Sequence, residues 1–149
     1  MGTLREKVII VTGGSSGIGR AAALGFARQG AKVLITARRA DPLGETVAEH
    51  ANIVGLVGDV AAAADAVRTV AKAVDTWGRL DALVNNAGAG AILPLVDASG
   101  DRIMRIFAVN VLGLSLLAAA ALPHLVATRG TIINVSSTFG HKPVAGLSH

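Results

Sequence analysis

The stretch Val8-Ile9-Ile10-Val11-Thr12-Gly13-Gly14-Ser15-Ser16-Gly17-Ile18-Gly19 decides the fold of this chain. Its first four residues are all apolar, which is typical of a strand buried on both faces inside a parallel sheet. A glycine-rich turn follows at once, and a helical pattern with one apolar face then runs from Ile18 to Arg28, where Gly30 stops it. A strand, a glycine turn and a helix in this order predict the first unit of an α/β domain.

The same alternation of apolar runs and helical patterns continues along the chain. Further strands are expected at Lys32–Thr36, Ile53–Val57, Leu80–Val84 and Thr131–Val135, and further helices at Pro42–His50, Ala61–Trp77 and about Asp101–Val126. Parallel strands need a crossover connection, which a helix supplies. Five strands with about four helices therefore predict a doubly wound, Rossmann-like parallel sheet in one domain that spans residues 1–149.

Composition narrows the class of protein. Of the 149 residues, 52% are hydrophobic and 16% are charged, which excludes a disordered chain. The net charge is +4, but the basic residues are scattered and aromatic residues make up only 3%, so no nucleic-acid partner is expected. The chain has no cysteine, and its four histidines are not spaced as metal ligands, so no metal site is expected. The polar N-terminus lacks a signal sequence, and a cytoplasmic location is expected.

One segment, Ile106 to Ala127, carries no charge over a length that could span a membrane. Asn110, Ser115, Pro123 and His124 interrupt it. We therefore expect a buried or interface helix and no membrane partner.

The glycines of the first turn indicate a phosphate ligand. Gly13 permits a tight turn, Gly17 lets the backbone approach a pyrophosphate, and Gly19 lets the helix pack close to the sheet. The phosphates then meet the free N–H groups at the positive end of the helix. A plain structural turn is the alternative. No Lys-Ser/Thr pair follows the turn, which disfavours a P-loop NTPase.

Thr12 to Gly19 resembles the T-G-x-x-x-G-[IL]-G signature of the short-chain dehydrogenases/reductases. Further motifs follow in that family's order and extend the resemblance to essentially the whole chain, which is identified as the truncated N-terminal part of such a domain. The resemblance implies a dinucleotide-binding domain at residues 1–149 and hydride transfer between a nicotinamide and a small carbonyl or alcohol substrate. The cofactor contacts it implies in the first turn are Gly13, Ser15, Ser16, Gly17, Ile18 and Gly19.

The end of the second expected strand bears on the choice of cofactor. An acidic residue there would bind the ribose of NAD, whereas an arginine accommodates the 2′-phosphate of NADP. Ala37 occupies the position that is acidic in NAD enzymes of the family, and Arg38 and Arg39 follow it. NADP(H) is therefore expected in preference to NAD(H). An ordinary exposed arginine pair is the alternative.

The next two motifs would hold the adenosine half of the cofactor. The family's aspartate at this point accepts a hydrogen bond from the adenine amino group, and Asp59-Val60 matches it; a helix cap for Ala61 onward is the alternative. Asn85-Asn86-Ala87-Gly88 matches the family's next motif. Its Asn86, Ala87 and Gly88 are expected at the cofactor, with the asparagine amides joining neighbouring strands.

Two residues match catalytic positions of the family. Asn110 corresponds to an asparagine that holds a water linking the active site to solvent, although a bond to neighbouring backbone is the alternative. Ser137 corresponds to the serine that donates to the substrate oxygen as charge develops there. Ser136 is expected to face the cofactor.

The family's general acid/base, a tyrosine with a lysine four residues later, has no match here. The chain contains no tyrosine, and Lys142 lies too early. We expect a truncated chain that is inactive alone and, when full length, forms a homo-oligomer through the helix that carries Asn110. A non-catalytic NADP-binding or interaction module is the alternative function. A methyltransferase is disfavoured by Arg38 and the Asn85–Gly88 motif.

Overall fold

The computed structural model describes residues 4–90, 94–138 and 142 of the chain. Within these residues, five parallel strands form one sheet in the order β3-β2-β1-β4-β5. The strands are β1 (Val8–Thr12), β2 (Lys32–Ala37), β3 (Ile53–Val57), β4 (Ala82–Asn85) and β5 (Thr131–Asn134). The order reverses direction between β1 and β4, as in a doubly wound α/β sheet, which confirms the predicted fold class.

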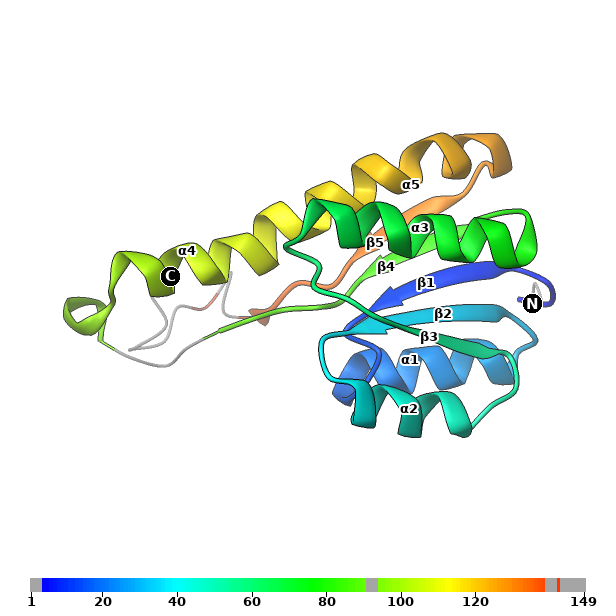
Figure 1. Cartoon of the computed structure of the whole chain (residues 1–149), viewed down its shortest axis with the longest axis horizontal. Helices are drawn as coiled ribbons and strands as arrows, with labels where there is room; N and C mark the ends of the chain where they lie inside the picture. Colours follow the sequence, from blue (N-terminus) through cyan, green and yellow to red (C-terminus); the bar gives the residue numbers. More distant parts are fainter. Residues whose placement is uncertain (1–3, 91–93, 139–141, 143–149) are drawn as a thin grey trace.

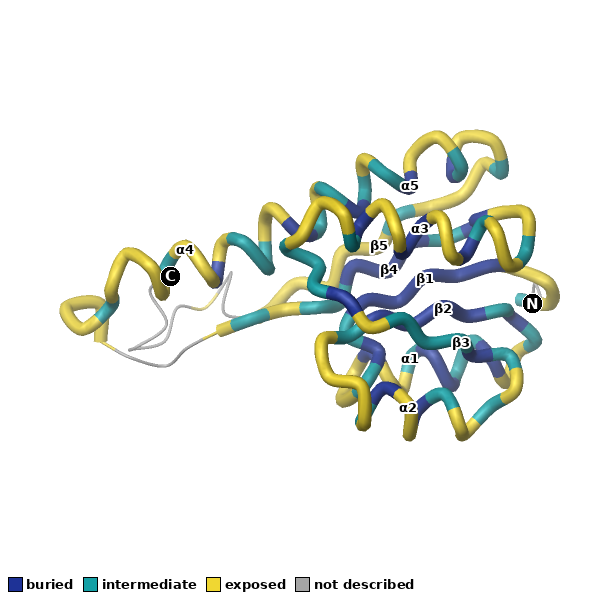
Figure 2. The backbone as a smooth tube through the Cα atoms, in the orientation of Figure 1, coloured by how far each residue is buried: buried dark blue, intermediate teal, exposed yellow. Residues whose placement is uncertain are grey.

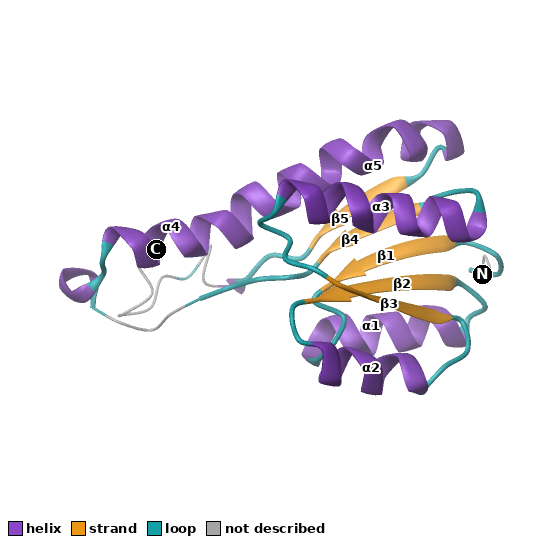
Figure 3. Cartoon of the chain, viewed as in Figure 1, coloured by secondary structure: helices purple, strands orange, loops and turns teal. Residues whose placement is uncertain are grey.

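Helices cover both faces of the sheet (Figure 1). In the described part of the chain they are α1 (Gly17–Arg28), α2 (Ala40–Ala48), α3 (Ala63–Trp77), α4 (Gly100–Phe107) and α5 (Leu114–Thr128), with a 3-10 turn η1 (Leu95–Asp97) and a π-helical segment η2 (Ala108–Gly113). Helices α1 and α2 lie on one face, and α3 and α5 on the other (Figure 3). The layers are those expected for alternating parallel strands and crossover helices.

The central strand β1 packs into a different core on each side. Val8 and Ile10 join α3 and α5 in one buried cluster, whereas Ile9 and Val11 join α1 and α2 in the other. Successive side chains of a strand point to opposite faces. An unbroken apolar run is therefore what a strand covered on both faces requires.

The long predicted helix forms, but it is not a single regular α-helix. α4, η2 and α5 are continuous from Gly100 to Thr128 and form the one helix among the described residues that is long and apolar enough to cross a membrane, a property that core helices of soluble proteins share. The π-helical turn between α4 and α5 was not anticipated. On the amino-terminal side of this turn, α4 projects past the carboxyl ends of the strands (Figure 1).

Only one side of this long helix is buried. Its buried residues include Ile106, Leu117 and Leu125, whereas its outer side exposes a row of large apolar residues: Met104, Phe107, Val111, Leu112, Leu122 and Val126. Figure 2 shows this alternation along α4 and α5. The expectation of a buried helix thus holds for one face, and an interface on the other stays a prediction.

Strand β5 lies at one end of the sheet and pairs only with β4 in the described structure. Ile133 is 46% exposed, and Val135, just past the strand, is 41% exposed. Strand β5 therefore forms an edge of the sheet with exposed apolar side chains and no second partner strand among the described residues.

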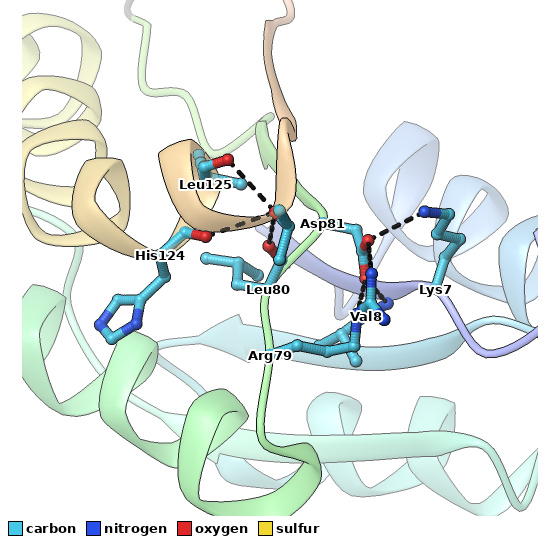
Figure 4. Close-up of polar contacts among 8 residues, drawn as sticks. Lys7, Val8, Arg79, Leu80, Asp81, His124 and Leu125 are labelled. Atoms are coloured by element: carbon cyan, nitrogen blue, oxygen red, sulfur yellow. Dashed lines mark hydrogen bonds and ion pairs between the residues drawn. The ribbon is translucent and has the colours of Figure 1, made fainter.

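Asp81 lies at the amino-terminal ends of the strands, where its side chain holds several segments together. Its carboxylate accepts hydrogen bonds from Lys7 Nζ at 3.0 Å and the Val8 amide at 3.0 Å, and from Arg79 Nε and Nη2 at 2.8 and 2.6 Å (Figure 4). The Thr128 hydroxyl, nearby, donates to the carbonyl of Leu80 at 2.6 Å. These bonds tie the start of β1 and the end of α5 to the segment that leads into β4.

Candidate functional site

A groove of about 770 Å³ opens at the carboxyl ends of β1, β2, β3 and β4. Ligands of open α/β sheets bind at this edge, where the strand order reverses. The groove brings together nearly all the cofactor-binding residues expected from the sequence: Gly13, Ser15, Ser16, Gly17, Ile18, Arg38, Arg39, Asp59, Val60, Asn86, Ala87 and Gly88. The one exception is Gly19, which is buried just beneath it.

The glycine turn has the tight backbone geometry that its sequence predicts. Gly13 has φ +67° and Gly17 has φ +53°, both in the left-handed region that favours glycine. Gly19 lies so close to the carbonyl oxygen of Gly13 and to Asn86 Nδ2 that a Cβ atom would overlap both. Gly19 therefore permits close packing of α1 against the turn and the loop after β4.

The start of α1 leaves donors facing the groove. Ser16 is the N-cap of α1, and its side chain makes no capping hydrogen bond. The first N–H groups of a helix have no partner within the helix. Gly17 and Ile18, which begin α1, line the groove, and helix starts of this kind bind phosphate.

Thr12 joins the glycine turn to the loop after β4. Its hydroxyl oxygen accepts from the amides of Asn86 and Ala87, each at 2.9 Å, while Asn86 Nδ2 donates to the Thr12 carbonyl at 2.9 Å. Asn85 Nδ2 donates to Asn134 Oδ1 at 2.9 Å, across to β5. The predicted role of the two asparagine amides in joining neighbouring strands is confirmed.

The basic pair follows β2 at the rim of the groove. Arg38 and Arg39 are exposed, and neither takes part in the ion pairs formed among residues 4–90, 94–138 and 142. Ala37 ends β2 and also lines the groove. This corner of the groove, formed by residues 37–39, thus carries two arginines and no acidic side chain.

Asp59 lines the groove and also makes a turn contact. Its Oδ1 accepts from the Ala61 amide at 3.0 Å, and its own amide donates to Asp65 Oδ2 at 2.7 Å. Helix α3 begins later, with Ala62 as N-cap. Asp59 therefore stabilises the turn before α3, and its other carboxylate oxygen has no partner among the described residues.

Asn110 lies in η2 and holds the loop that follows β4. Its Oδ1 accepts from the Ala89 amide at 2.8 Å, and its Nδ2 donates to the Ala89 carbonyl at 2.7 Å. The bond to neighbouring backbone, raised as an alternative from the sequence, is thus formed. π-Helical turns occur often at functional sites. A role for Asn110 in holding a water stays a prediction.

The serine segment lies after β5. Ser136 and Ser137 are both exposed, and neither they nor Asn110 line the groove. The structure therefore gathers the expected nucleotide contacts at one place but does not bring the two expected catalytic residues into that groove. The role of Ser137 stays a prediction.

Four further residues line the groove without having been anticipated: Thr36, Gly58, Ala89 and Val109. Thr36 and Gly58 lie at the carboxyl ends of β2 and β3, so sheet topology would have placed them there. Ala89 follows the Asn85–Gly88 motif. Val109 comes from η2, and no local sequence signal brings that helix to the groove.

Thr36 adds an unsatisfied polar atom. Two buried side-chain atoms of the described residues lack a hydrogen-bond partner, Thr36 Oγ1 and Asn85 Oδ1. Buried polar atoms are normally paired. Because Thr36 lines the groove, a polar group of a ligand or a water there would complete its hydrogen bonding.

The described residues contain no cluster of three or more acidic, histidine or cysteine side chains suited to a metal.

The fold and the groove define a Rossmann-like nucleotide-binding protein, and comparison with known proteins specifies the family. Residues 7–149 match the family described as short chain dehydrogenase. The chain belongs to this family of short-chain dehydrogenases/reductases.

Two of the similar proteins carry the names of dehydrogenases. The chain is 38% identical over 149 residues to the cis-2,3-dihydrobiphenyl-2,3-diol dehydrogenase of Pseudomonas sp. (strain KKS102), covering 96% of this chain and 54% of that protein. It is 40% identical over 144 residues to the L-rhamnose 1-dehydrogenase (NAD(P)(+)) of Sphingomonas sp. (strain SKA58), covering 92% and 57%. The chain thus spans little more than half the length of these relatives.

Solved structures agree in fold. A short chain dehydrogenase/reductase from Burkholderia phymatum in complex with NAD superposes with a TM-score of 0.93 at 29% identity, covering 99% of this chain and 54% of that one. The 3-ketoacyl-(acyl-carrier-protein) reductase from Brucella melitensis complexed with NADH also gives 0.93, at 31% identity, covering 98% and 63%. The family binds nicotinamide cofactors.

Proposed function

We propose that this chain is the cofactor-binding part of an NADP(H)-dependent oxidoreductase that transfers a hydride between the nicotinamide and a small carbonyl or alcohol substrate. The observation that carries the cofactor preference is the corner after β2, where Ala37 takes the place of an acidic side chain and Arg38 and Arg39 line the groove without ion-pair partners among the described residues. An arginine fork matches a phosphate in shape and charge.

The groove fits a dinucleotide by three independent features. Its volume suits a ligand of that size. The uncapped start of α1 supplies N–H donors for a pyrophosphate. Ile18 is 69% exposed at the groove, although it is apolar, so a bound ring would cover it. The unpaired hydroxyl of Thr36 offers one further polar contact.

The residues divide along the groove by chemistry. Gly13, Ser15, Ser16, Gly17 and Ile18 would hold the pyrophosphate, and Gly19 would keep α1 close enough for this. Arg38 and Arg39 would bind the 2′-phosphate. Asp59 and Val60 would bind the adenine edge, and the backbone of Asn86, Ala87 and Gly88 would contact the adenosine half. When bound, the cofactor supplies the hydride acceptor or donor.

The protein's own contribution to the chemistry would come from Ser137 and Asn110. The Ser137 hydroxyl would donate a hydrogen bond to the substrate oxygen and stabilise the negative charge that develops there. Asn110 would hold the wall of the groove in place through Ala89. The family's general acid/base is a tyrosine, which these 149 residues do not contain, so we infer no turnover by this chain alone. The comparisons do not favour a purely non-catalytic module.

Replacing Arg38 with Asp tests the cofactor preference. A hydrogen bond to a charged group contributes about 1.5–3 kcal/mol, so the Arg38→Asp variant should bind NADPH roughly tenfold to a hundredfold more weakly. NADH affinity should be equal or better, because an aspartate accepts from the ribose hydroxyls. Calorimetric titration of both nucleotides measures the ratio, with Arg28→Asp, at the far end of α1, as control. An unchanged NADPH/NADH ratio would reject NADP(H) preference.

We further propose that the full-length protein is a cytoplasmic homo-oligomer. The exposed apolar row on α4, η2 and α5 supports this, because so large an uncovered apolar surface is unusual for a monomer. Placing a charge at its centre, as in Val111→Glu, should shift the assembly toward monomer in sedimentation velocity. A wild-type protein that sediments as a monomer would contradict the proposal.

A further inference from the structure

A second hollow, of about 440 Å³, adjoins the nucleotide groove on its α4 side. The two share four lining residues, Arg38, Asp59, Ala89 and Val109, so they are neighbouring parts of one depression. The far wall of the second hollow is made by α4 and the start of η2. The proposed division of the groove leaves this far wall without a role.

The far wall is basic because of the register of α4. Arg102, Arg105 and Val109 are three and four residues apart, which places them on one face of a continuous helix. All three line the hollow. The same helix turns Ile106 toward the hollow's buried side. The helix thus places two arginines in the wall of the hollow, in addition to Arg38, which follows β2.

The arginines of this hollow have no ion-pair partner among the described residues. Within the described parts of the chain, Arg38, Arg102 and Arg105 form no ion pair. Asp101, one turn before Arg105, forms none either, although its spacing would allow one. Among the described residues that line the hollow, Asp59 is the one with a carboxylate, and one of its oxygens already accepts from the Ala61 amide.

Three arginines and one aspartate among the described residues line the hollow, so it has a net positive charge that a dianion would neutralise. We propose that Arg102 and Arg105, with Arg38, form a second phosphate-binding site beside the adenosine end of the nucleotide groove. Guanidinium groups bind phosphate oxygens through paired hydrogen bonds. The phosphate is either carried by the bound dinucleotide or belongs to a separate ligand beside it. The inference rests on the proposed nucleotide-binding function.

The test compares wild-type protein with the double variant Arg102→Gln/Arg105→Gln. Three calorimetric titrations are made into each: NADPH, NADH, and inorganic phosphate into NADH-saturated protein. Exposed charge pairs contribute about 0.2–1 kcal/mol each, so two arginines should account for about a fivefold change in affinity. Arg28→Gln removes an exposed arginine at the far end of α1 and serves as the matched control. Circular dichroism checks that each variant is folded.

A selective loss of NADPH affinity, with NADH affinity kept, supports the site and identifies its phosphate as part of the dinucleotide. Unchanged affinity for both nucleotides, with loss of inorganic phosphate binding, supports the site for a separate phosphate ligand. No change in any of the three titrations, or an equal loss for NADPH and NADH, overturns the proposal. Failure of the NADP(H) preference is detected separately, as an unchanged nucleotide ratio in Arg38→Asp.

Discussion

Gly19→Ala is expected to abolish measurable nucleotide binding and to destabilise the domain by several kcal/mol. The new methyl group would overlap the carbonyl oxygen of Gly13 and the side chain of Asn86. Overpacking a tight interior contact costs typically about 1–3 kcal/mol, and more where backbone must move. Because Gly13 and Asn86 belong to the groove, any shift that relieves the overlap also displaces ligand-binding groups.

Gly25→Ala is the matched control for this substitution. Gly25 lies in the same helix, and a Cβ atom there meets nothing within 4 Å. Alanine is the better helix former, so this variant should be as stable as wild type or more stable by up to about 1 kcal/mol. Urea unfolding and NADPH titration measure both variants. Wild-type NADPH affinity in Gly19→Ala would show that α1 need not approach the turn so closely.

Asp81→Asn is expected to destabilise the domain by about 1–3 kcal/mol at neutral pH. The Asp81 side chain is only 6% exposed and accepts four hydrogen bonds, three of them from charged groups. Asparagine keeps the shape but loses the charge and turns an amide donor toward other donors. The partners Lys7 and Arg79 remain half exposed, so the loss should be smaller than for a fully buried pair.

The same carboxylate makes stability depend on pH in a defined direction. Burial alone would raise the pKa of Asp81, but hydrogen bonds from Arg79, Val8 and Lys7, with the charge of Arg79, hold its pKa below the ordinary value. A carboxyl whose pKa is lowered on folding stabilises the folded state above its unfolded pKa of about 3.9. This stabilisation is lost as the pH falls through the folded-state pKa.

Urea unfolding at neutral pH and in steps below pH 4 should therefore show wild type and Asp81→Asn converging in stability as the pH falls. Asp75→Asn, on the exposed side of α3 and without an ion pair among the described residues, should follow wild type throughout. A difference in the free energy of unfolding between wild type and Asp81→Asn that stays constant at all pH values would contradict this prediction. It would show that the contribution of residue 81 to stability does not depend on its charge.

The strands and the nucleotide groove could be predicted because their signals are local. The apolar run Val8 to Val11 fixed β1, and each groove motif stands directly after a strand, so parallel topology alone brings Gly13, Arg38, Asp59 and Asn86 to one edge. Differences at helix ends, such as α3 starting at Ala63 and not Ala61, are of the size expected where caps decide the boundary.

What could not be predicted depends on contacts between distant parts of the chain. Lys7 donates to Asp81 from 74 residues away in the sequence, so no spacing rule would pair the two. In the π-helical segment η2, Val109 lies at the groove and Asn110 contacts Ala89. The sequence predicted a regular helix from Asp101 to Val126, which gave no indication of either position. Arg102 and Arg105 could be assigned a role only after the structure had placed α4 beside the groove.

One oxygen atom, the hydroxyl of Thr12, connects two walls of the groove by accepting from two consecutive amides. Two hydrogen bonds of 2.9 Å thus hold the two walls together. We therefore expect the groove to keep its dimensions when the chain beyond β5 is changed. A designer who leaves Thr12 and Asn86 untouched should therefore be able to change the chain after β5 without rebuilding the groove.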